Sequence, residues 1–483
     1  MEASVVVVGA GPTGLTLAAE LRLAGVDVVV VERLAGASGE SRGIGLTLRS
    51  MEVLDQRGLL PRFGPLETGT HGHFGGIPLD MTVLGSALDA ARAVPQSVTE
   101  RVLEGRAREL GAHILRGTEV CEVEADADAV RVRTRGAGPA SLRARFLVGC
   151  DGGRSTVRKA AGFDFPGTAA TTELLLADLR GVEPVSRAPG SQVPGGMAMS
   201  ARMPDGTHRV IVAERGAPPR DRTEPPSFAE VADVWKRLTG DDISRAEPLW
   251  VSAFGDAARL ATAYRRGRIL LAGDAAHVHL PAGGQGMNTG IQDAMNLGWK
   301  LASVLRGRAP DSLLDTYHSE RHPVGRALLD NTRAQSLLIL GGDEVQPLRA
   351  LLGELRGYPQ VERLLAARVS GLDIRYEVGG GTHPLLGARM PRLDLDLGGR
   401  RVDTARLLHR GRGQLLDLTA NSVLRERARP WSDRIDIVTA QPVTPLAGTT
   451  AVLVRPDGHV AWTAPGSHDD LPTALNRWFG APR

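Results

Sequence analysis

The stretch that decides the fold is Val5-Val6-Val7-Val8-Gly9-Ala10-Gly11-Pro12-Thr13-Gly14, close to the N-terminus. Four β-branched residues in a row are typical of a buried parallel strand, and the residues after Gly14 have the apolar spacing of a helix. In such a unit the first glycine permits a tight turn, the second lets the backbone approach a pyrophosphate, and the third lets helix and strand pack closely. The helix N-terminus adds free N–H groups and a partial positive charge for phosphates. The stretch therefore predicts a Rossmann-type dinucleotide-binding unit.

A second β-branched run, Val28–Val31, ends at Glu32. An acidic residue at the end of the second strand, about 20 residues after the glycines, accepts hydrogen bonds from ribose hydroxyls. A glycine motif alone is weak evidence, but the strand, the helix and Glu32 together make it specific. The unit does not by itself distinguish FAD from NAD.

Two further glycine motifs follow predicted strands. Phe146–Gly149 ends a strand and leads into Cys150-Asp151-Gly152, and Arg268–Ala272 leads into Gly273-Asp274. A glycine-rich loop, Leu280–Asn288, comes next, and then an apolar helical stripe. We expect that helix to begin near Asn288 or Thr289, with Asn288 as its cap or with Thr289 and Gln292 as a capping box.

With these motifs in this order, the chain resembles the class A flavoprotein monooxygenases of the p-hydroxybenzoate hydroxylase type. The segments Gln96–Glu100, Leu280–Asn288 and Arg455–Trp462 are similar to aromatic polyketide hydroxylases, above all to the angucycline oxygenases of actinobacteria, and the likeness runs from Val5 to Pro482. The resemblance implies bound FAD, NADPH as a transient co-substrate, O2, and hydroxylation of a polycyclic aromatic polyketide, typically at C-12, through a flavin C4a-hydroperoxide. The absence of a second strand–GxGxxG–helix unit in the sequence agrees with transient NADPH binding.

The resemblance also assigns roles to residues. Asp274 is expected on the flavin ribityl chain, and Asp151, Gly152 and Arg158 are expected to serve both FAD and NADPH. The N-terminus of the helix after the third motif is expected to face the flavin pyrimidine ring, where its dipole would stabilise reduced flavin. The sequence identifies no general base. The full set of expected cofactor-binding residues is Gly9, Gly11, Pro12, Thr13, Gly14, Glu32, Arg33, Arg42, Gln96, Val120, Asp151, Gly152, Arg158, Asp274, Pro281, Gly284, Gly286, Met287 and Asn288.

The expected fold class is α/β, a Rossmann-like FAD-binding domain with an inserted β-sheet substrate domain and a C-terminal thioredoxin-like domain. We expect the FAD-binding domain at 1–70, 100–175 and 260–340, and the substrate domain at 71–99 and 176–259. A helical linker is expected at 341–384, and the thioredoxin-like domain at 385–483. This last segment contains no cysteine, so its expected role is structural or in contacts of a homo-oligomer. The substrate pocket should be large and apolar, and Met81, Met197, Met199 and Trp235 are candidates to line it.

Composition excludes several classes of protein. The 483 residues carry a net charge of +3 with no basic run, which argues against nucleic acid binding. No apolar run approaches the ~18 residues of a membrane span, and Val5–Val8 is too short for a signal peptide, so we expect a cytoplasmic protein. The pairs His71/His73 and His277/His279 lack further ligands at metal spacing, so no metal site is expected. Cys121 and Cys150 are expected to be structural.

Three alternatives remain open at this point. The first is that the flavin peroxide performs a Baeyer–Villiger insertion, or inactivates an aromatic antibiotic, on the same scaffold. A flavin dehydrogenase would oxidise its substrate without inserting oxygen. A non-enzymatic flavin sensor is the third alternative, although the sequence shows no appended DNA-binding or signalling segment.

Overall fold

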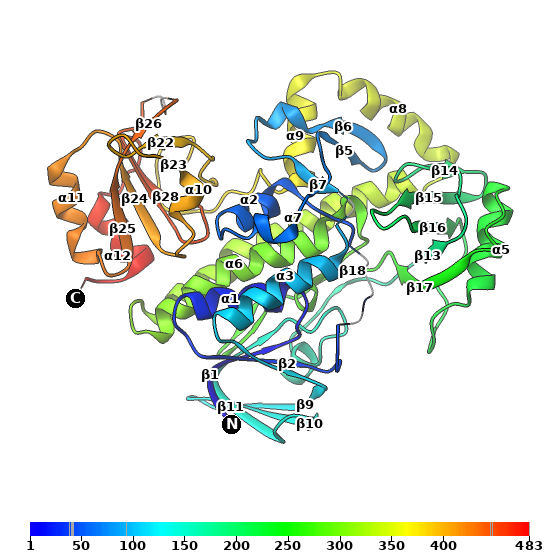
Figure 1. Cartoon of the computed structure of the whole chain (residues 1–483), viewed down its shortest axis with the longest axis horizontal. Helices are drawn as coiled ribbons and strands as arrows, with labels where there is room; N and C mark the ends of the chain where they lie inside the picture. The colour runs from blue at the N-terminus through cyan, green and yellow to red at the C-terminus, as the bar shows by residue number, and fades with distance from the viewer. Residues whose placement is uncertain (38, 40–42, 93, 445, 447, 483) are drawn as a thin grey trace.

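The computed structural model describes residues 1–37, 39, 43–92, 94–444, 446 and 448–482. Arg42, one of the expected FAD contacts, lies outside the described residues. Three sheet-containing regions lie side by side, with the N-terminal region between the other two (Figure 1).

The central sheet is built around the N-terminal strand. Its spatial order is β19 (Arg265–Arg266), β20 (Ile269–Leu271), β11 (Ser141–Gly149), β1 (Glu2–Val8), β2 (Val28–Glu32) and β8 (His113–Arg116). From β20 to β8 neighbouring strands are parallel. The antiparallel hairpin of β9 (Thr118–Ala125) and β10 (Val130–Gly136) joins the sheet at β11. The sheet therefore draws its strands from all three segments expected for the FAD-binding domain, whose boundaries remain a proposal.

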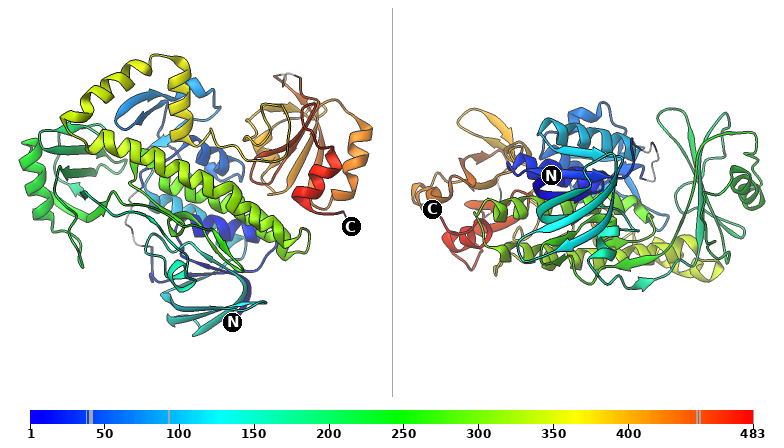
Figure 2. Two further views of the ribbon diagram at one scale, coloured as in Figure 1. Left: turned by 180° about the vertical axis from the view of Figure 1, so that it is seen from behind. Right: turned by 90° about the horizontal axis from the view of Figure 1, so that it is seen from below.

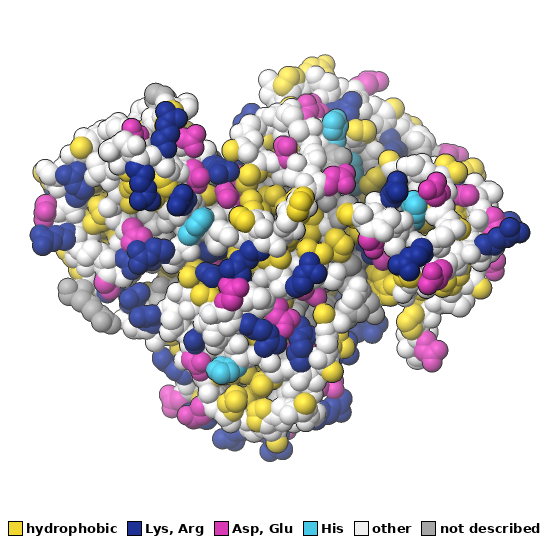
Figure 3. All heavy atoms as spheres, viewed as in Figure 1, with side chains coloured by type: hydrophobic (Ala, Val, Ile, Leu, Met, Phe, Trp, Pro, Cys, Tyr) yellow, Lys and Arg dark blue, Asp and Glu magenta, His cyan; other side chains and the backbone are white. Residues whose placement is uncertain are grey.

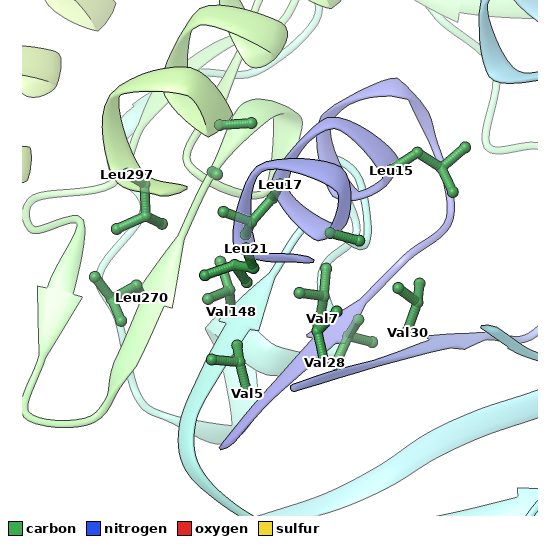
Figure 4. Packing of buried hydrophobic residues seen from close by; sticks show 14 of the residues in the cluster. Val5, Val7, Leu15, Leu17, Leu21, Val28, Val30, Val148, Leu270 and Leu297 are labelled. Carbon is green, nitrogen blue, oxygen red and sulfur yellow. The ribbon is translucent and has the colours of Figure 1, made fainter. Parts of the chain in front are cut away.

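Four helices share the hydrophobic core of this sheet: α1 (Pro12–Leu23), α3 (Gln96–Glu109), α6 (Gln285–Leu305) and α7 (Asp315–Leu340). The apolar face of α1 packs on the buried valines of β1 and β2, and Leu297 of α6 and Leu270 of β20 extend the same core (Figure 4). Because α1 also packs along α6, the helix after the first glycine motif is fixed against the helix after the third. Shorter elements complete this region: α2 (Leu48–Asp55), α4 (Thr156–Ala160), β3 (Gly45–Leu46), β4 (Thr68–Gly69), β7 (Ala90–Arg92), β12 (Gly167–Thr168), β18 (Ala258–Leu260) and β21 (His277–Val278).

A five-stranded sheet forms the second region, in the order β14 (Gln192–Val193), β15 (Gly196–Arg202), β16 (His208–Glu214), β13 (Glu173–Arg180) and β17 (Glu247–Gly255). Helix α5 (Phe228–Thr239) covers one of its faces. Residues 71–80, which we expected in the same substrate domain, form a separate hairpin of β5 (His71–Phe74) and β6 (Ile77–Asp80). That hairpin packs against α9 (Pro359–Ser370), so the two expected substrate segments lie in different sheets.

The segment expected as a helical linker, 341–384, contains α8 (Gln346–Leu355) and α9, and its role as a linker between domains stays a prediction. The C-terminal region then forms a four-stranded sheet in the order β25 (Ile435–Thr439), β24 (Gly413–Asp417), β27 (Ala451–Val454) and β28 (Val460–Ala464). Only the β25–β24 pair is parallel, and α11 (Ser422–Ala428) connects these two strands. Helix α12 (Leu471–Phe479) follows, and the remaining elements are α10 (Thr404–Leu407), β22 (Asp394–Asp396), β23 (Arg401–Asp403) and β26 (Gln441–Pro442). The expected fold class is thereby confirmed.

The surface has no single-sign charged region on the face shown in Figure 3, where basic and acidic side chains are interspersed. Among the described helices, none is long and apolar enough to cross a membrane. Within the same described part of the chain, no group of three or more metal-binding side chains comes together.

Candidate functional site

The first glycine turn is packed on one side and open on the other. Gly9 has φ +104°, and a Cβ there would collide with the carbonyl of Cys150. A Cβ at Gly14 would collide with the Gly9 carbonyl, whereas one at Gly11 would meet no atom within 4 Å. Helix α1 starts at this open side without a side-chain cap, so its first N–H groups are available to a ligand. The turn thus fits a pyrophosphate placed against Gly11.

Glu32 stands at the end of β2, next to this turn. Its Oε2 accepts the Ala10 N–H at 2.8 Å, and its Oε1 accepts the Leu34 N–H at 2.8 Å. Each carboxylate oxygen has further lone pairs, so these bonds orient Glu32 and leave it able to accept a ribose hydroxyl. The neighbouring Arg33 is exposed.

The Asp151-Gly152 motif has internal partners. Asp151 accepts hydrogen bonds from the Ser155 hydroxyl at 2.5 Å and from the Thr156 and Val157 N–H groups at 2.6 and 3.1 Å, and so holds the start of α4. Gly152 has φ +77° and open space where a side chain would be. The space beside Gly152 is therefore open to a ligand.

Arg158 connects this motif to the third one. Its guanidinium donates to the carbonyls of Ala275 at 2.9 Å and Gly153 at 2.7 Å, and it lies 3.8 Å from the centre of the Phe165 ring. The side chain is buried. Its visible role is to hold the second and third motifs together, and a role toward a nucleotide stays a prediction.

The third motif meets the first at Thr13. A Cβ at Gly273 would lie 2.6 Å from the Thr13 hydroxyl oxygen, and a Cβ at Gly290 of α6 would collide with the same atom. Close approach at these two glycines is what brings the Gly273-Asp274 turn and α6 onto α1. Asp274 is exposed, and its Oδ1 lies 4.0 Å from where a Cβ of Gly286 would be. Asp274 therefore stands beside the start of α6.

The expected start of α6 is wrong. The helix begins at Gln285, with Gly284 as its N-cap at φ +67° and no side-chain cap. Asn288 lies inside the first turn, where its amide donates to the carbonyls of Gly284 at 2.7 Å and Gly45 at 3.3 Å and accepts the Thr47 N–H at 3.0 Å. Asparagine is a common N-cap residue, which is why the sequence suggests Asn288. The N-cap position is instead taken one turn earlier by Gly284, whose left-handed conformation glycine adopts readily.

The other expected contacts gather near this helix start. The Gln96 backbone donates to the Gly43 carbonyl at 3.1 Å, and the Gln96 and Met287 side chains both lie within 4 Å of where a Cβ of Gly43 would be. Pro281 is exposed on the loop before α6. Val120, by contrast, is buried in the core of the central sheet. Its side chain is thus occupied by packing.

His279 and Gly286 lie in contact on this loop. The His279 Nδ1 lies 2.7 Å from the Leu280 carbonyl oxygen, so Nδ1 carries the proton and Nε2 is an acceptor facing Gly286. Burial lowers the pKa of His279 to about 4. The loop is therefore uncharged at this position near neutral pH.

Sequence reasoning missed a buried cluster behind the third motif. Asp293 accepts the Gly273 N–H at 3.0 Å, the His277 Nε2–H at 2.7 Å and the Arg321 Nε–H at 2.6 Å. Burial acts to raise the pKa of Asp293, but Arg321 and His277 outweigh it and lower the pKa overall. An acid within an otherwise apolar helix face was the available signal, since buried carboxylates need charged partners.

The five-stranded sheet turns an apolar face toward the loop before α6. Met197, Met199 and Ile211 pack there in one cluster with Leu280 and Ala282 of the loop. Trp235 belongs to α5 and packs on the opposite face of the sheet, and Met81 packs in the cluster around α9. Of the four expected lining residues, Met197 and Met199 are thus beside the candidate site, and Met81 and Trp235 are core residues.

Known protein families and solved structures match this chain over the regions described above. Residues 2–332 match the family described as FAD binding domain, and residues 383–482 match aromatic-ring hydroxylase, C-terminal. The solved structure of CabE, an aromatic hydroxylase from angucycline biosynthesis, is 61% identical with a TM-score of 0.98 and full coverage of both chains. BexE, solved in a study of oxidation during BE-7585A biosynthesis, is 65% identical with a TM-score of 0.96 and the same coverage.

Among curated proteins, the 12-dehydrotetracycline 5-monooxygenase/anhydrotetracycline 6-monooxygenase of Streptomyces rimosus is 44% identical over 504 residues, with 100% of each chain covered. The likeness includes both matched families and the region between them. It therefore extends over the flavin motifs, the five-stranded sheet and the C-terminal region. The chain belongs to the FAD-binding aromatic-ring hydroxylases and is a flavin-dependent aromatic monooxygenase.

Proposed function

We propose that this enzyme hydroxylates a polycyclic aromatic polyketide of the angucycline type, with NADPH as the transient reductant and O2 as the oxygen source. The observation that carries the proposal is the apolar sheet face with Met197 and Met199, which packs against the loop between Asp274 and α6. The full-length likeness to an angucycline aromatic hydroxylase supports the same substrate class. We further propose that the enzyme is located in the cytoplasm, where NADPH is available. We also propose that it forms a homo-oligomer.

We propose that the flavin binds where the three glycine motifs meet. Gly11 and Gly152 leave open space for the cofactor, and Glu32 is held at the glycine turn by the Ala10 N–H. In this proposal Glu32 binds the ribose and Asp274 binds the ribityl chain. The uncapped start of α6 would supply N–H groups and a positive dipole to the flavin ring. FAD held there would supply the acceptance of a hydride from NADPH and the activation of O2, chemistry that no amino acid side chain provides.

The protein's own contribution is to bind, orient and shield. Methionine is flexible and polarizable, so Met197 and Met199 suit a flat fused-ring substrate whose edge must lie near the flavin. The same apolar face excludes water. Exclusion of water limits side reactions during oxygen transfer and strengthens electrostatic interactions within the site. Because an electron-rich phenol is itself reactive toward electrophilic oxygen, the reaction does not require a strong base on the protein.

The test is turnover with a panel of polycyclic phenols in the presence of 18O2, with mass analysis of the products. We expect one atom of labelled oxygen in the product, the other in water, and NADPH oxidation that accelerates when substrate is added. Label from water in the product would contradict the proposed chemistry. Oxidised substrate without added oxygen would indicate a dehydrogenase, and an inserted ring oxygen would indicate a Baeyer–Villiger enzyme. The position of hydroxylation, expected at C-12 of an angucyclinone, is read from the NMR spectrum of the product.

A further inference from the structure

A turn of the C-terminal region inserts charged side chains between the two long helices of the flavin region. Arg455 and Asp457, both buried, lie in the turn between β27 and β28. Arg455 donates to the two carboxylate oxygens of Glu320 on α7 at 2.6 and 2.9 Å, and to Asp457 at 2.5 Å. The Trp299 indole on α6 donates to Asp457 at 3.1 Å. The C-terminal turn therefore bonds to both α6 and α7.

The charges in this cluster balance. Lys300 of α6 donates to Glu320 at 2.7 Å, so two cations, Lys300 and Arg455, face two anions, Glu320 and Asp457. All four side chains are at most 3% exposed. Lys300 and Glu320 pair α6 with α7, Arg455 and Asp457 pair within the turn, and the bond from Arg455 to Glu320 joins the two pairs. A buried charge that loses a partner is strongly unfavourable, so this bond couples the C-terminal turn to both helices.

A second chain of contacts runs from this turn to the flavin motif. Arg321, next to Glu320 on α7, donates to Asp293 at 2.6 Å and to the Tyr376 hydroxyl at 3.0 Å. Asp293 in turn holds the N–H of Gly273, the residue before Asp274. The Tyr376 ring lies 4.2 Å from the His459 ring and 5.1 Å from the Arg455 guanidinium. The path from the C-terminal turn to Gly273 is thus continuous and buried.

We propose that the C-terminal domain helps to form the flavin site. Tyr376, Arg321 and Asp293 are positioning residues through which its contacts fix the position of the Gly273-Asp274 turn. The long helices α6 and α7 run between the C-terminal region and the five-stranded sheet (Figure 2). Contacts of the C-terminal domain with these helices therefore act on two rigid elements of the flavin region. The assignment explains why a domain without cysteines stays attached to a flavin enzyme. It rests on the proposed contact of Asp274 with FAD but not on the choice of aromatic substrate.

The test uses Tyr376→Phe in the full-length protein. The substitution removes one hydroxyl and leaves the ring in contact with His459, so we expect the fold to be retained. The matched control is Tyr358→Phe, because Tyr358 is 63% exposed. Two quantities are measured: the dissociation constant of FAD, and the hydrogen exchange rate of the Gly273 amide in the apo-protein. For Tyr376→Phe we expect FAD binding to weaken and exchange to accelerate by about 2- to 30-fold, the range of network substitutions, and neither to change in the control.

Equal values for Tyr376→Phe and the control would overturn the proposal, as would lower thermal stability with unchanged FAD binding and unchanged Gly273 exchange. A double-mutant cycle with Arg321→Lys provides the second test, because a lysine cannot reproduce the forked contacts of Arg321. A double variant no weaker for FAD than the stronger single variant supports one shared path. Fully multiplicative effects would mean two independent contacts and refute it. If wild type failed to bind FAD, the flavin assignment itself would be wrong, while exchange at Gly273 would still test the path in the apo-protein.

Discussion

Replacing Glu320 by Gln removes one charge from the buried cluster between the C-terminal turn and the long helices. The Glu320 carboxylate accepts four hydrogen bonds, one from Asn296, one from Lys300 and two from Arg455. A glutamine keeps the shape but places an NH2 donor toward other donors and leaves one buried positive charge in excess. Breaking a buried ion pair from one side costs about 3–5 kcal/mol. We therefore expect the free energy of unfolding to fall by that amount.

The pKa of Glu320 provides a second estimate of how much this carboxylate contributes to the free energy of unfolding. Burial acts to raise it, but Arg455 and Lys300 outweigh burial and lower it from 4.5 to about 2. A shift of this size corresponds to about 3 kcal/mol of stability. Because the folded-state pKa is depressed, this contribution is fully present above pH 4.5 and is lost as the pH falls toward 2. The difference between wild type and Glu320→Gln should shrink over that same interval.

The assay is urea unfolding followed by intrinsic fluorescence and flavin release, with the midpoints compared at pH 7 and through the acid range. Glu354→Gln is the matched control, because Glu354 is exposed on α8 and its substitution should change stability by less than about 0.5 kcal/mol. A midpoint for Glu320→Gln equal to that of the control would refute the reasoning. A pH-independent difference between wild type and variant would refute the assignment of the effect to the Glu320 charge.

Other substitutions test the flavin motifs. Gly290→Ala should weaken FAD binding, since overpacking against Thr13 costs about 1–3 kcal/mol, whereas Gly353→Ala, with no atom near its added methyl, should bind FAD as wild type does. Glu32→Ala should cost about 1.5–3 kcal/mol of FAD binding free energy, the value of a hydrogen bond to a charged group, and an unchanged affinity by fluorescence titration would place the ribose elsewhere. Cys150→Ser should keep more than about a tenth of wild-type turnover, because burial raises the pKa of the Cys150 thiol well above its ordinary value and keeps it unreactive; a folded but inactive variant would contradict this.

The sequence was sufficient for the order of the flavin motifs because each depends on local features. Gly9 has a positive φ and approaches the Cys150 backbone closely, Gly14 approaches the Gly9 carbonyl, and Gly273 has a positive φ and packs on the Thr13 side chain. A sequence pattern records such requirements for glycine directly. The start of α6 was misplaced because Gly284, a residue with no side chain to signal a cap, takes the N-cap position. The Asp293–Arg321 pair was missed because its partners are separated along the chain, and only the packing of α6 on α7 brings them together.

Buried charges between the C-terminal turn and the long helices also address a problem of geometry. The proposed flavin site combines segments around Gly11, Gly152 and Asp274, so small shifts of α6 would separate them. Apolar contacts are favourable but non-directional, and they tolerate sliding. Bonds such as those from Arg455 to both oxygens of Glu320 fix direction and register. Such a cluster contributes less stability than an apolar core of equal volume. Its value here follows from its position. It fixes α6 and α7 in register near the start of α7, whereas the end of α7 packs through Ile339 on the sheet face with Met197 and Met199, where we propose that the substrate binds.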